Sequence, residues 1–351
     1  MLKILQYYTQ FNLGGTEKVI YSIFNNIDMN KFECYFLGKK KGKYDYLLLD
    51  NNVNLKIIED NNSFAKNVFT YFIENDFDII HVHNCEEMSL ILKIAKKAGI
   101  KKRIAHSHVA RNDLNKFSWL LKSIKSININ YYANTYFACS ESAAKWLFGV
   151  NSKKSYVMLN GININCFSFN EKIRNDIRKK FKIGNKNKLL IMVSRISFEK
   201  NHKFLIDVME KLIKYDNSYK LFIIGDGPLF FSIKNYVNEK KLNKNIYMLG
   251  EIKNVRDFLS AADGFLMPSL YEGLGISAVE AQYNGLYCLC SDRIPFEVDI
   301  EENLCNFLPL SIDVWVSKIL SINVRNNNIC IQSDKYDIKK IVSDVEREYL
   351  K

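Results

Sequence analysis

Residues 264–291 read GFLMPSLYEGLGISAVEAQYNGLYCLCS. An apolar run, a glycine-rich turn, a helical pattern over 276–284 and a second apolar run follow one another. A strand, a helix and a strand in this order favour two parallel strands joined by a crossover helix. Two acids, Glu272 and Glu280, flank the turn, where the helix offers free backbone N–H groups to a ligand. The alternative is a plain loop that runs into a helix.

The same alternation of strand and helix runs through the whole chain. Apolar runs typical of strands lie at 2–8, 34–38, 54–59, 78–83, 103–108, 135–140 and 155–161, and again at 188–194, 220–225, 245–250, 264–269 and 286–291. In the second series the helical patterns cover 201–214, 229–240, 254–261 and 276–284. This order predicts an α/β protein with doubly wound parallel sheets. Two series of similar length predict two Rossmann-like domains, residues 1–165 and 166–336.

Length and composition limit the classes of protein to which the chain can belong. The 351 residues suit two domains, and no run of about 20 apolar residues exists to span a bilayer. The start of the chain is too short and too polar for a signal peptide, and the eight cysteines form no CxxC pair. These features predict reduced thiols in a cytoplasmic protein. The net charge of +12 suits an anionic partner, whereas a nucleic-acid recognition motif is absent.

Four turns that follow strands are candidate ligand sites, because doubly wound sheets bind ligands at the carboxyl ends of their strands. They are Leu13–Glu17 with its paired glycines, Arg195–His202, Gly225–Pro228, and the turn before residue 276. None matches GxGxxG or GxxxxGK[ST], so nicotinamide and P-loop sites lose support. Solvated cations and ordinary turns remain the alternative interpretation of the middle two.

Two histidine pairs end strands in the first half: His81 with His83, and His106 with His108. The period of two residues places each pair on one face of its strand. A zinc site is conceivable, but no carboxylate or cysteine stands at a standard spacing, so a substrate-binding or catalytic histidine is favoured. Asp76 and Asp78 look like a metal-binding DxD, yet they precede their strand and so lie at the wrong end of the sheet.

The motifs together resemble a known family. They are GGTEKVI (14–20), DIIHVHN (78–84), RIAHSHVAR (103–111), ACSESAAKWLFG (138–149), LNGININCF (159–167), VSRISFEKNH (193–202), IIGDGP (223–228), MLG (248–250) and PSLYEGLGISAVEAQYNG (268–285). The chain resembles retaining glycosyltransferases of the GT-B architecture, family four, in the branch that builds bacterial capsule, exopolysaccharide or lipopolysaccharide. The last motif matches the EX7E signature of that family.

The resemblance implies a fold and a set of residue roles. Two Rossmann-like domains would face a central cleft, with the N-terminal domain holding the acceptor and the helix over 337–351 crossing back to it. The implied donor-binding residues are Gly15, Arg195, Lys200, Gly225, Gly273, Leu274, Gly275 and Glu280, and the implied catalytic residues are His108 and Glu272. The donor would be a nucleotide-sugar, UDP-linked, carrying a hexose or N-acetylhexosamine. No metal and no cofactor are implied.

In detail, the resemblance places Arg195 and Lys200 on the donor diphosphate and Glu280 on the ribose. Glu272 and the backbone of 273–275 would face the donor sugar and phosphate, His108 would lie near the transferred sugar, and Gly15 near the phosphates. The chain departs from the family pattern after the signature helix. No Gly-Gly turn follows it, and Gln-Tyr-Asn at 282–284 replaces the more usual Met-Ala, which bears on recognition of the donor base.

Other functions stay open. A nucleotide-sugar epimerase or a phosphorylase on the same architecture would turn over without an acceptor or would require phosphate, and a catalytically silent subunit would bind a partner only. Segment 115–132 mixes Lys116, Lys122 and Lys125 with Trp119 and two leucines. It predicts either peripheral contact with the anionic inner face of the membrane or a core helix with a solvated face.

Overall fold

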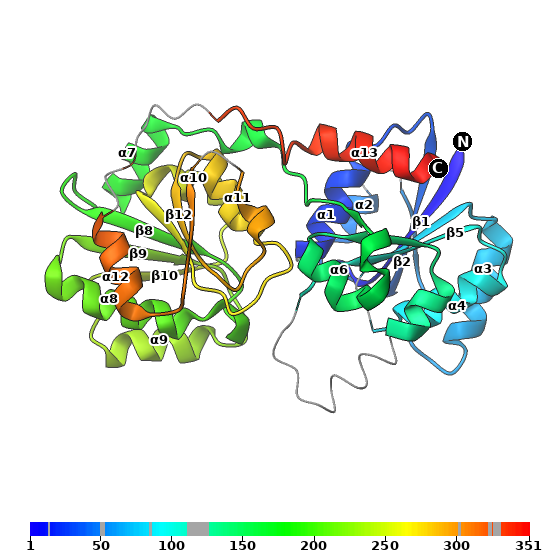
Figure 1. Ribbon diagram of the computed structural model, residues 1–351, viewed down its shortest axis with the longest axis horizontal. Helices are drawn as coiled ribbons and strands as arrows, with labels where there is room; N and C mark the ends of the chain where they lie inside the picture. Colours follow the sequence, from blue (N-terminus) through cyan, green and yellow to red (C-terminus); the bar gives the residue numbers. More distant parts are fainter. Residues whose placement is uncertain are drawn as a thin grey trace. The chain divides into compact units, whose positions relative to one another are not determined.

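Two parallel β-sheets organise the chain, one in each of two units (Figure 1). The computed structural model describes residues 1–12, 15–49, 53–83, 86–110, 126–300, 303–321, 325 and 331–351. Unit 1 comprises Met1–Ile162 and Asp337–Lys351, and unit 2 comprises Asn163–Tyr336. The boundary expected between residues 165 and 166 lies slightly after this division.

Unit 1 holds a seven-stranded sheet in the order β3-β2-β1-β4-β5-β6-β7, in which all neighbours are parallel. Its strands are β1 (Leu2–Gln10), β2 (Phe32–Lys40), β3 (Asn54–Ile57), β4 (Ile79–His83), β5 (Lys102–Ser107), β6 (Thr135–Ala138) and β7 (Tyr156–Val157). Its named helices are α1 (Gly15–Phe24), α2 (Tyr46–Leu49), α3 (Phe64–Asn75), α4 (Met88–Lys97), α6 (Glu141–Phe148), the 3-10 helix η1 (Gly149–Lys154) and α13 (Ile338–Leu350). Each run predicted as a strand in this half of the chain forms one.

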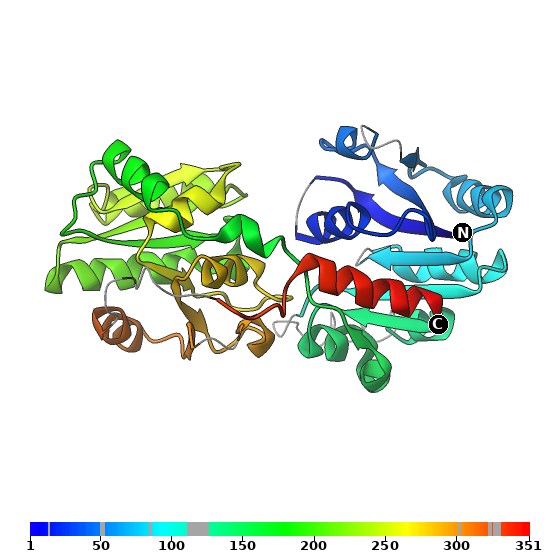
Figure 2. The ribbon, with the colours of Figure 1, turned by 90° about the horizontal axis from the view of Figure 1, so that it is seen from above.

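The C-terminal helix α13 packs on the unit 1 sheet although it is last in the sequence (Figure 2). Its buried residues join those of α1 and β1 in one apolar cluster. Polar contacts hold it as well: the Asp28 backbone N–H donates to Glu346 Oε1 over 2.7 Å, and Lys102 Nζ donates to the Glu348 carbonyl over 2.7 Å. The helix predicted over 337–351 therefore belongs to unit 1.

Unit 2 holds a six-stranded parallel sheet in the order β10-β9-β8-β11-β12-β13. Its strands are β8 (Lys188–Val193), β9 (Tyr219–Ile224), β10 (Ile246–Gly250), β11 (Gly264–Met267), β12 (Tyr287–Ser291) and β13 (Cys305–Leu308). Its helices are η2 (Ile164–Phe167), α7 (Glu171–Lys180), η3 (Phe198–Lys200), α8 (His202–Tyr215), α9 (Phe230–Glu239), α10 (Val255–Ala261), α11 (Ile276–Tyr283), η4 (Phe296–Val298) and α12 (Ile312–Ser321). The four predicted helices form, whereas the sequence pattern did not indicate β13 and α12.

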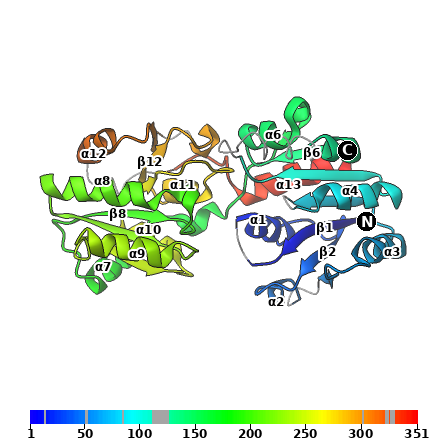
Figure 3. The same ribbon diagram turned by 90° about the horizontal axis from the view of Figure 1, so that it is seen from below.

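Helices cover both faces of the unit 2 sheet, as a doubly wound fold requires. Helices α8 and α12 lie side by side on one face (Figure 3), where Leu205 and Trp315 join the same buried cluster as Leu221 of β9. On the other side α7 packs against α10. The sheet is therefore buried on both faces, which explains why its strands read as continuous apolar runs rather than as alternating ones.

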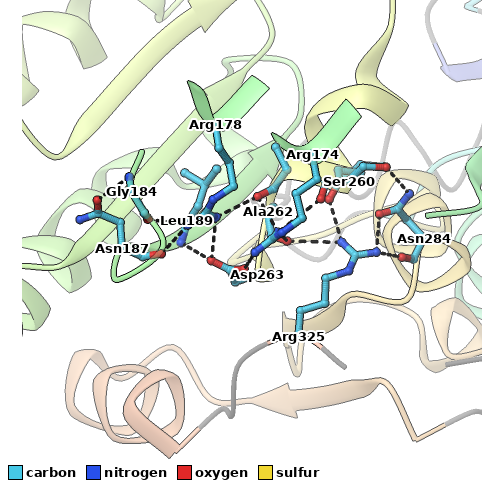
Figure 4. Close-up of polar contacts among 12 residues, drawn as sticks. Arg174, Arg178, Gly184, Asn187, Leu189, Ser260, Ala262, Asp263, Asn284 and Arg325 are labelled. Carbon is cyan, nitrogen blue, oxygen red and sulfur yellow. Dashed lines mark hydrogen bonds and ion pairs between the residues drawn. The ribbon is translucent and has the colours of Figure 1, made fainter. Parts of the chain in front are cut away.

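A buried ionic network ties α7 and α10 to the amino ends of β8 and β11 (Figure 4). Asp263 accepts hydrogen bonds from Arg174 over 2.5 Å, from Arg178 over 3.2 Å and from the Leu189 backbone N–H over 2.7 Å. Arg174, Arg178 and Arg325 also donate to backbone carbonyls at the end of α10. Arginines at a helix C-terminus satisfy its free carbonyls and complement its dipole.

The six cysteines that the structure describes are free thiols: Cys34, Cys139, Cys166, Cys288, Cys290 and Cys305. Cys288 and Cys290 are buried in β12, and Cys290 lies 3.6 Å from the Cys305 sulfur in the neighbouring strand. The buried thiols of Cys288, Cys290 and Cys305 serve as small apolar core residues.

Candidate functional site

The order of strands in unit 2 places a topological switch point between β8 and β11. The chain continues from β8 to β9 on one side and from β11 to β12 on the other. Ligands of open α/β sheets bind where the connections diverge in this way, outside the carboxyl ends of the strands. The turn after β8 carries Arg195 and Lys200, and the turn after β11 carries Glu272. The structure therefore brings these predicted site residues to one edge of one sheet.

Lys200 and Glu272 form one ion pair at this edge. The Lys200 ammonium donates to both carboxylate oxygens of Glu272, over 2.7 Å and 2.6 Å, and the buried Ser269 hydroxyl donates to the same carboxylate over 2.8 Å. The side chain of Glu272 is 9% exposed and that of Lys200 is 18% exposed. An ammonium has three N–H donors, so Lys200 can still donate to a ligand while Glu272 holds it in place.

The two turns that carry this pair are also joined through their backbones. The Leu270 N–H donates to the Glu199 carbonyl over 2.7 Å, and the Asn201 side-chain amide donates to the Pro268 carbonyl over 3.1 Å. Asn201 has a left-handed backbone with φ 58°, which asparagine tolerates better than most residues. The pair is therefore held by fixed loops before any ligand binds, which is the condition for effective electrostatic stabilisation.

Gly225 has a clear structural role in the turn after β9. Its φ is 136°, and a Cβ atom there would lie 1.9 Å from the Ser194 carbonyl oxygen. The two turns are joined at this point, because the Ile196 N–H donates to the Asp226 carbonyl over 2.9 Å. Glycine is thus required so that the turn after β9 can support the turn that carries Arg195. Contact of Gly225 with a donor stays a prediction.

Arg195 is exposed at the end of β8. Within the ranges that the structure describes, its guanidinium forms no hydrogen bond or ion pair. Its charge is therefore available to an anion, in contrast to the charge of Lys200, which already has a carboxylate partner. An arginine fork suits two oxygens of a phosphate group.

The turn after β11 leads into α11 through Gly273, Leu274 and Gly275. Leu274 is buried with 2% of its surface exposed, so only its backbone can contact a ligand. Gly275 stands at the helix N-cap with φ 101° and has no side chain of its own to cap the first N–H groups. Glu280 lies in the second turn of the helix and is half-buried. Free N–H groups beside a cation are suited to binding an anion.

The Gln-Tyr-Asn sequence that departs from the family pattern fastens α11 to its surroundings. Gln282 donates to the Val298 carbonyl over 2.9 Å and accepts from the Ile300 N–H over 3.2 Å. The Tyr283 hydroxyl donates to the Ser333 carbonyl over 3.0 Å, and Asn284 donates to the Phe167 carbonyl over 2.7 Å. The contacts of the two amide side chains are therefore structural ones.

Unit 1 has its own switch point between β1 and β4, since β1 continues to β2 on one side and β4 to β5 on the other. Gly15 begins α1 just after β1 and is exposed, and a Cβ atom there would meet nothing within 4 Å. Packing among described residues therefore does not require glycine at this position. Its partner Gly14 lies outside the described residues.

The four histidines of the two predicted pairs lie together at this edge, buried to 8% exposure or less. His81 Nε2 lies 3.0 Å from His106 Nδ1, and His83 Nδ1 lies 2.9 Å from His108 Nε2. Each pair lies on one face of its strand, as predicted, with ring centroids 4.2 Å apart for His81 and His83 and 3.8 Å apart for His106 and His108. His83 ends β4 and His108 follows β5, so this second pair lies nearest the carboxyl edge.

Burial sets the protonation state of the cluster. Desolvation lowers the pKa of His81, His83 and His106 well below the usual value, and it lowers the pKa of His108 to about 3. Repulsion within the cluster adds to this effect for the first three. All four imidazoles are therefore neutral at pH 7, and each has one N–H donor and one acceptor nitrogen.

A metal fits this cluster poorly. His81, His83 and His106 can each offer a nitrogen within 4.8 Å of the others. However, the rings of His81 and His83 are stacked, with centroids 4.2 Å apart and planes at 24°. An imidazole binds a metal along the lone pair in its ring plane, so two stacked rings do not converge on one ion. The hydrogen bonds between the rings account for the cluster better than a zinc ion does.

Two residues that the sequence did not single out complete the network. Gln6 in the middle of β1 donates to the Tyr349 hydroxyl over 3.1 Å, and its carbonyl lies 2.7 Å from His83 Nε2. The Tyr349 hydroxyl of α13 lies 2.7 Å from His81 Nδ1. The available signal was a glutamine in the buried middle of β1, between Leu5 and Tyr7, because a buried amide needs hydrogen-bond partners.

Known proteins are similar to this chain in sequence and in fold. A family model described as Glycosyl transferases group 1 matches residues 173–307. EpsF of Bacillus subtilis (strain 168), a glycosyltransferase by name, is 30% identical over 335 residues, which cover 90% of this chain and 86% of EpsF. The chain belongs to the glycosyl transferases group 1 family.

Two further proteins add detail. The UDP-Gal:alpha-D-GlcNAc-diphosphoundecaprenol alpha-1,3-galactosyltransferase of Escherichia coli is 24% identical over 381 residues, covering 96% of this chain and 94% of the relative. The structure of Alr3699/HepE of Anabaena in complex with UDP-glucose has a TM-score of 0.83 at 16% identity, with 99% of both chains covered. The predicted family and the GT-B fold class are thereby confirmed.

Proposed function

We propose that the protein is a retaining, metal-independent glycosyltransferase that moves a hexose or N-acetylhexosamine from a UDP-sugar. The acceptor would be a glycan or a lipid-linked saccharide in the assembly of a surface polysaccharide. The observation that carries the proposal is the Lys200–Glu272 pair, fixed beside the exposed Arg195 at the switch point of unit 2. Membership of the glycosyltransferase family supports it.

The charges at this edge suit the departure of a nucleoside diphosphate. In the reaction the bond between the sugar C1 and the diphosphate oxygen breaks, and a new bond forms between C1 and an acceptor hydroxyl. The electron pair of the broken bond stays on the diphosphate, whose negative charge grows as the bond breaks, and a diphosphate oxygen takes up the proton that the acceptor hydroxyl loses. Arg195 and Lys200 would stabilise the diphosphate charge with the free N–H groups of α11, which is why no metal is proposed. Glu280 would accept from the ribose hydroxyls.

Glu272 has two parts in this proposal. Its carboxylate orients Lys200 through two short contacts, and its remaining acceptor capacity would hold a hydroxyl of the donor sugar. In unit 1, His108 would contact the transferred sugar and Gly15 would let the backbone approach the phosphates, as the family resemblance implies. The named relative from Escherichia coli, which uses UDP-Gal and a diphosphoundecaprenol-linked acceptor, supports a UDP-sugar and a lipid-linked saccharide.

A donor screen followed by a transfer assay tests the proposal. UDP-sugars should raise the melting temperature more than GDP-sugars, because a ligand that binds only the folded chain stabilises it by mass action. With the stabilising donor and a saccharide–diphosphate–lipid acceptor, UDP should be released at the same rate with and without EDTA. The product linkage should keep the anomeric configuration of the donor by NMR. Release that depends on added divalent metal would contradict the metal-independent part.

The same assay separates the other functions. An epimerase would convert the UDP-sugar without any acceptor, and a phosphorylase would require inorganic phosphate. A silent subunit would bind the nucleotide without turnover, and in that case replacing Glu272 with alanine would leave the assay unchanged. We expect instead that turnover needs the acceptor and is lowered strongly in Glu272→Ala.

Contact with an anionic membrane is a second part of the proposal. Most of the basic segment at 115–132 lies outside the described residues, but residues 126–132 are helical and expose Ile127 and Tyr131, each to 67%. The Lys96 ammonium lies 4.2 Å from the Tyr131 ring centroid, so a cation and an aromatic ring share this surface. None of the described helices is both long and apolar enough to span a bilayer. Sedimentation with anionic vesicles at low salt tests the contact, and a chain that stays in the supernatant would refute it.

A further inference from the structure

The buried histidines form two hydrogen-bonded arms that meet at one side chain, Gln6. Its amide nitrogen donates to the Tyr349 hydroxyl over 3.1 Å, and its amide oxygen lies 2.7 Å from His83 Nε2. One arm runs from Tyr349 to His81 and His106, and the other runs from His83 to His108. Gln6 itself is 5% exposed, so water does not substitute for these partners.

The direction of the hydrogen bonds in the second arm follows from Gln6. A carbonyl oxygen only accepts, so His83 must carry its proton on Nε2 to donate to Gln6. Because the ring is neutral, His83 Nδ1 is then an acceptor, and its partner at 2.9 Å, His108 Nε2, must be the donor. The remaining nitrogen, His108 Nδ1, therefore has no proton. It is buried and has no hydrogen-bond partner among the described residues.

The first arm follows in the same way. The Gln6 amide nitrogen only donates, so the Tyr349 oxygen accepts from it. No other acceptor for the Tyr349 proton is found in the described part of the chain, so that proton goes to His81 Nδ1 at 2.7 Å. His81 then carries its own proton on Nε2 and donates it to His106 Nδ1 at 3.0 Å. His106 ends the arm with an Nε2–H that has no partner among the described residues.

We propose that Gln6 is a positioning residue that fixes the tautomer of all four histidines, and thereby leaves His108 Nδ1 as a hydrogen-bond acceptor. What this tautomer means for catalysis rests on the proposed function. If His108 contacts the transferred sugar, it accepts a hydrogen bond from a sugar hydroxyl rather than donating one. The opposite orientation of the Gln6 amide would reverse every bond in both arms and put the proton on Nδ1 of each ring.

The experiment is a long-range proton–nitrogen NMR correlation on the full chain, labelled with 15N-histidine. The chain contains five histidines. This spectrum distinguishes an Nε2–H ring from an Nδ1–H ring, and single His→Gln variants assign the signals. We expect the Nε2–H form for all four clustered histidines in the wild type. An Nδ1–H form, or a mixture, at His108 in the wild type overturns the inference.

Three variants test which side chain fixes the histidine tautomers. Gln6→Leu should release all four clustered histidines from the single Nε2–H form and lower transfer about tenfold, the equivalent of one hydrogen bond. Tyr349→Phe should release the His81 arm only. Gln10→Leu, which removes a half-buried amide of the same strand that donates to Lys41, should leave the histidine spectrum unchanged.

If His108 keeps the pure Nε2–H form in Gln6→Leu, Gln6 does not set the tautomer and the inference is wrong, whatever happens to the rate. The wild-type spectrum can refute the proposal even where a variant fails to fold. A wild-type chain with the expected spectrum but no transfer with any nucleotide-sugar would instead refute the proposed function. The two failures are therefore distinguishable.

Discussion

The polar clusters at the switch points of the two units differ in kind. Unit 1 places four histidines and one glutamine beneath its carboxyl edge, and all of them are neutral and hydrogen-bonded to one another. Unit 2 uses charges: Lys200 pairs with Glu272 at the carboxyl edge, and Asp263 pairs with two arginines at the amino edge. The sheets share one topology at their switch points, so the difference lies in the side chains alone.

The contrast fits a division of tasks. Fixed charges suit the binding of a charged diphosphate, and a neutral acceptor suits a sugar hydroxyl. It also predicts different weaknesses. A buried charge is costly when its partner is removed, whereas a buried neutral histidine is costly when acid protonates it.

The largest expected effect is on the stability of unit 2. Asp263→Ala should lower the free energy of unfolding by about 3–5 kcal/mol, because it leaves buried arginines without their carboxylate. Asp176→Ala removes an exposed acid of α7 and should change the free energy of unfolding by less than about 0.5 kcal/mol. Urea unfolding followed by circular dichroism measures both. Equal stability of the two variants would mean that the buried charges are not what holds unit 2 together.

The next effect is on catalysis. Lys200→Ala should lower kcat by about 100- to 1000-fold, the usual cost of one fixed electrostatic donor. Lys203→Ala is the matched control, because this exposed lysine of α8 has its ammonium 5.4 Å from the Tyr236 ring centroid. Steady-state release of UDP measures both variants. If the kcat of Lys200→Ala lies within about threefold of that of Lys203→Ala, Lys200 does not belong to the site. Its removal would then raise the activation free energy by less than about 1 kcal/mol.

Acid should weaken unit 1 more than unit 2. The folded pKa of the buried histidines lies below the unfolded value of about 6.5, so the unfolded chain binds more protons between these values. The free energy of unfolding is therefore intact above pH 6.5 and falls as the pH drops below it, by about 1.4 kcal/mol per pH unit for each such histidine.

Urea unfolding at pH 7.5, 6 and 5 checks this dependence. His202 of unit 2 has a pKa that burial lowers to about 4. A His202→Asn variant therefore removes the contribution of unit 2's buried histidine to the pH dependence of stability. We expect the free energy of unfolding of this variant still to fall between pH 6 and pH 5 by most of the amount seen in the wild type. A variant with stability independent of pH in this range would show that the unit 1 cluster is not held neutral.

The smallest effect concerns Gly15. A Cβ atom there meets nothing within 4 Å, so Gly15→Ala should not destabilise unit 1 and could add up to about 1 kcal/mol of helix propensity. Transfer should nevertheless fall about tenfold, if the donor phosphates approach this backbone. Gly184→Ala in unit 2, where the nearest atom is 3.5 Å away, is the control for both readouts. Undiminished transfer in Gly15→Ala would exclude it from the donor site.

Much of the fold could be predicted because its signals are local. Both sheets are buried on two faces, so their strands are apolar runs that a window of a few residues detects. Strand β13 and helix α12 were missed, since β13 is short and lies between segments without a clear period. The network around Asp263 was missed for another reason: its arginines come from α7 and from residue 325, and only folding brings them together.

The sequence by itself determined most of the order of strands and helices, the glycine turns and the family. It also placed the histidine pairs on one strand face, because the side-chain period of a strand is fixed by local geometry. Only the tertiary structure decided that Lys200 and Glu272 are one ion pair, that Gly225 serves the packing of two turns, and that Gln6 joins the histidines to Tyr349. Pairing and burial depend on residues far apart in the chain, and no local pattern records which of them will meet.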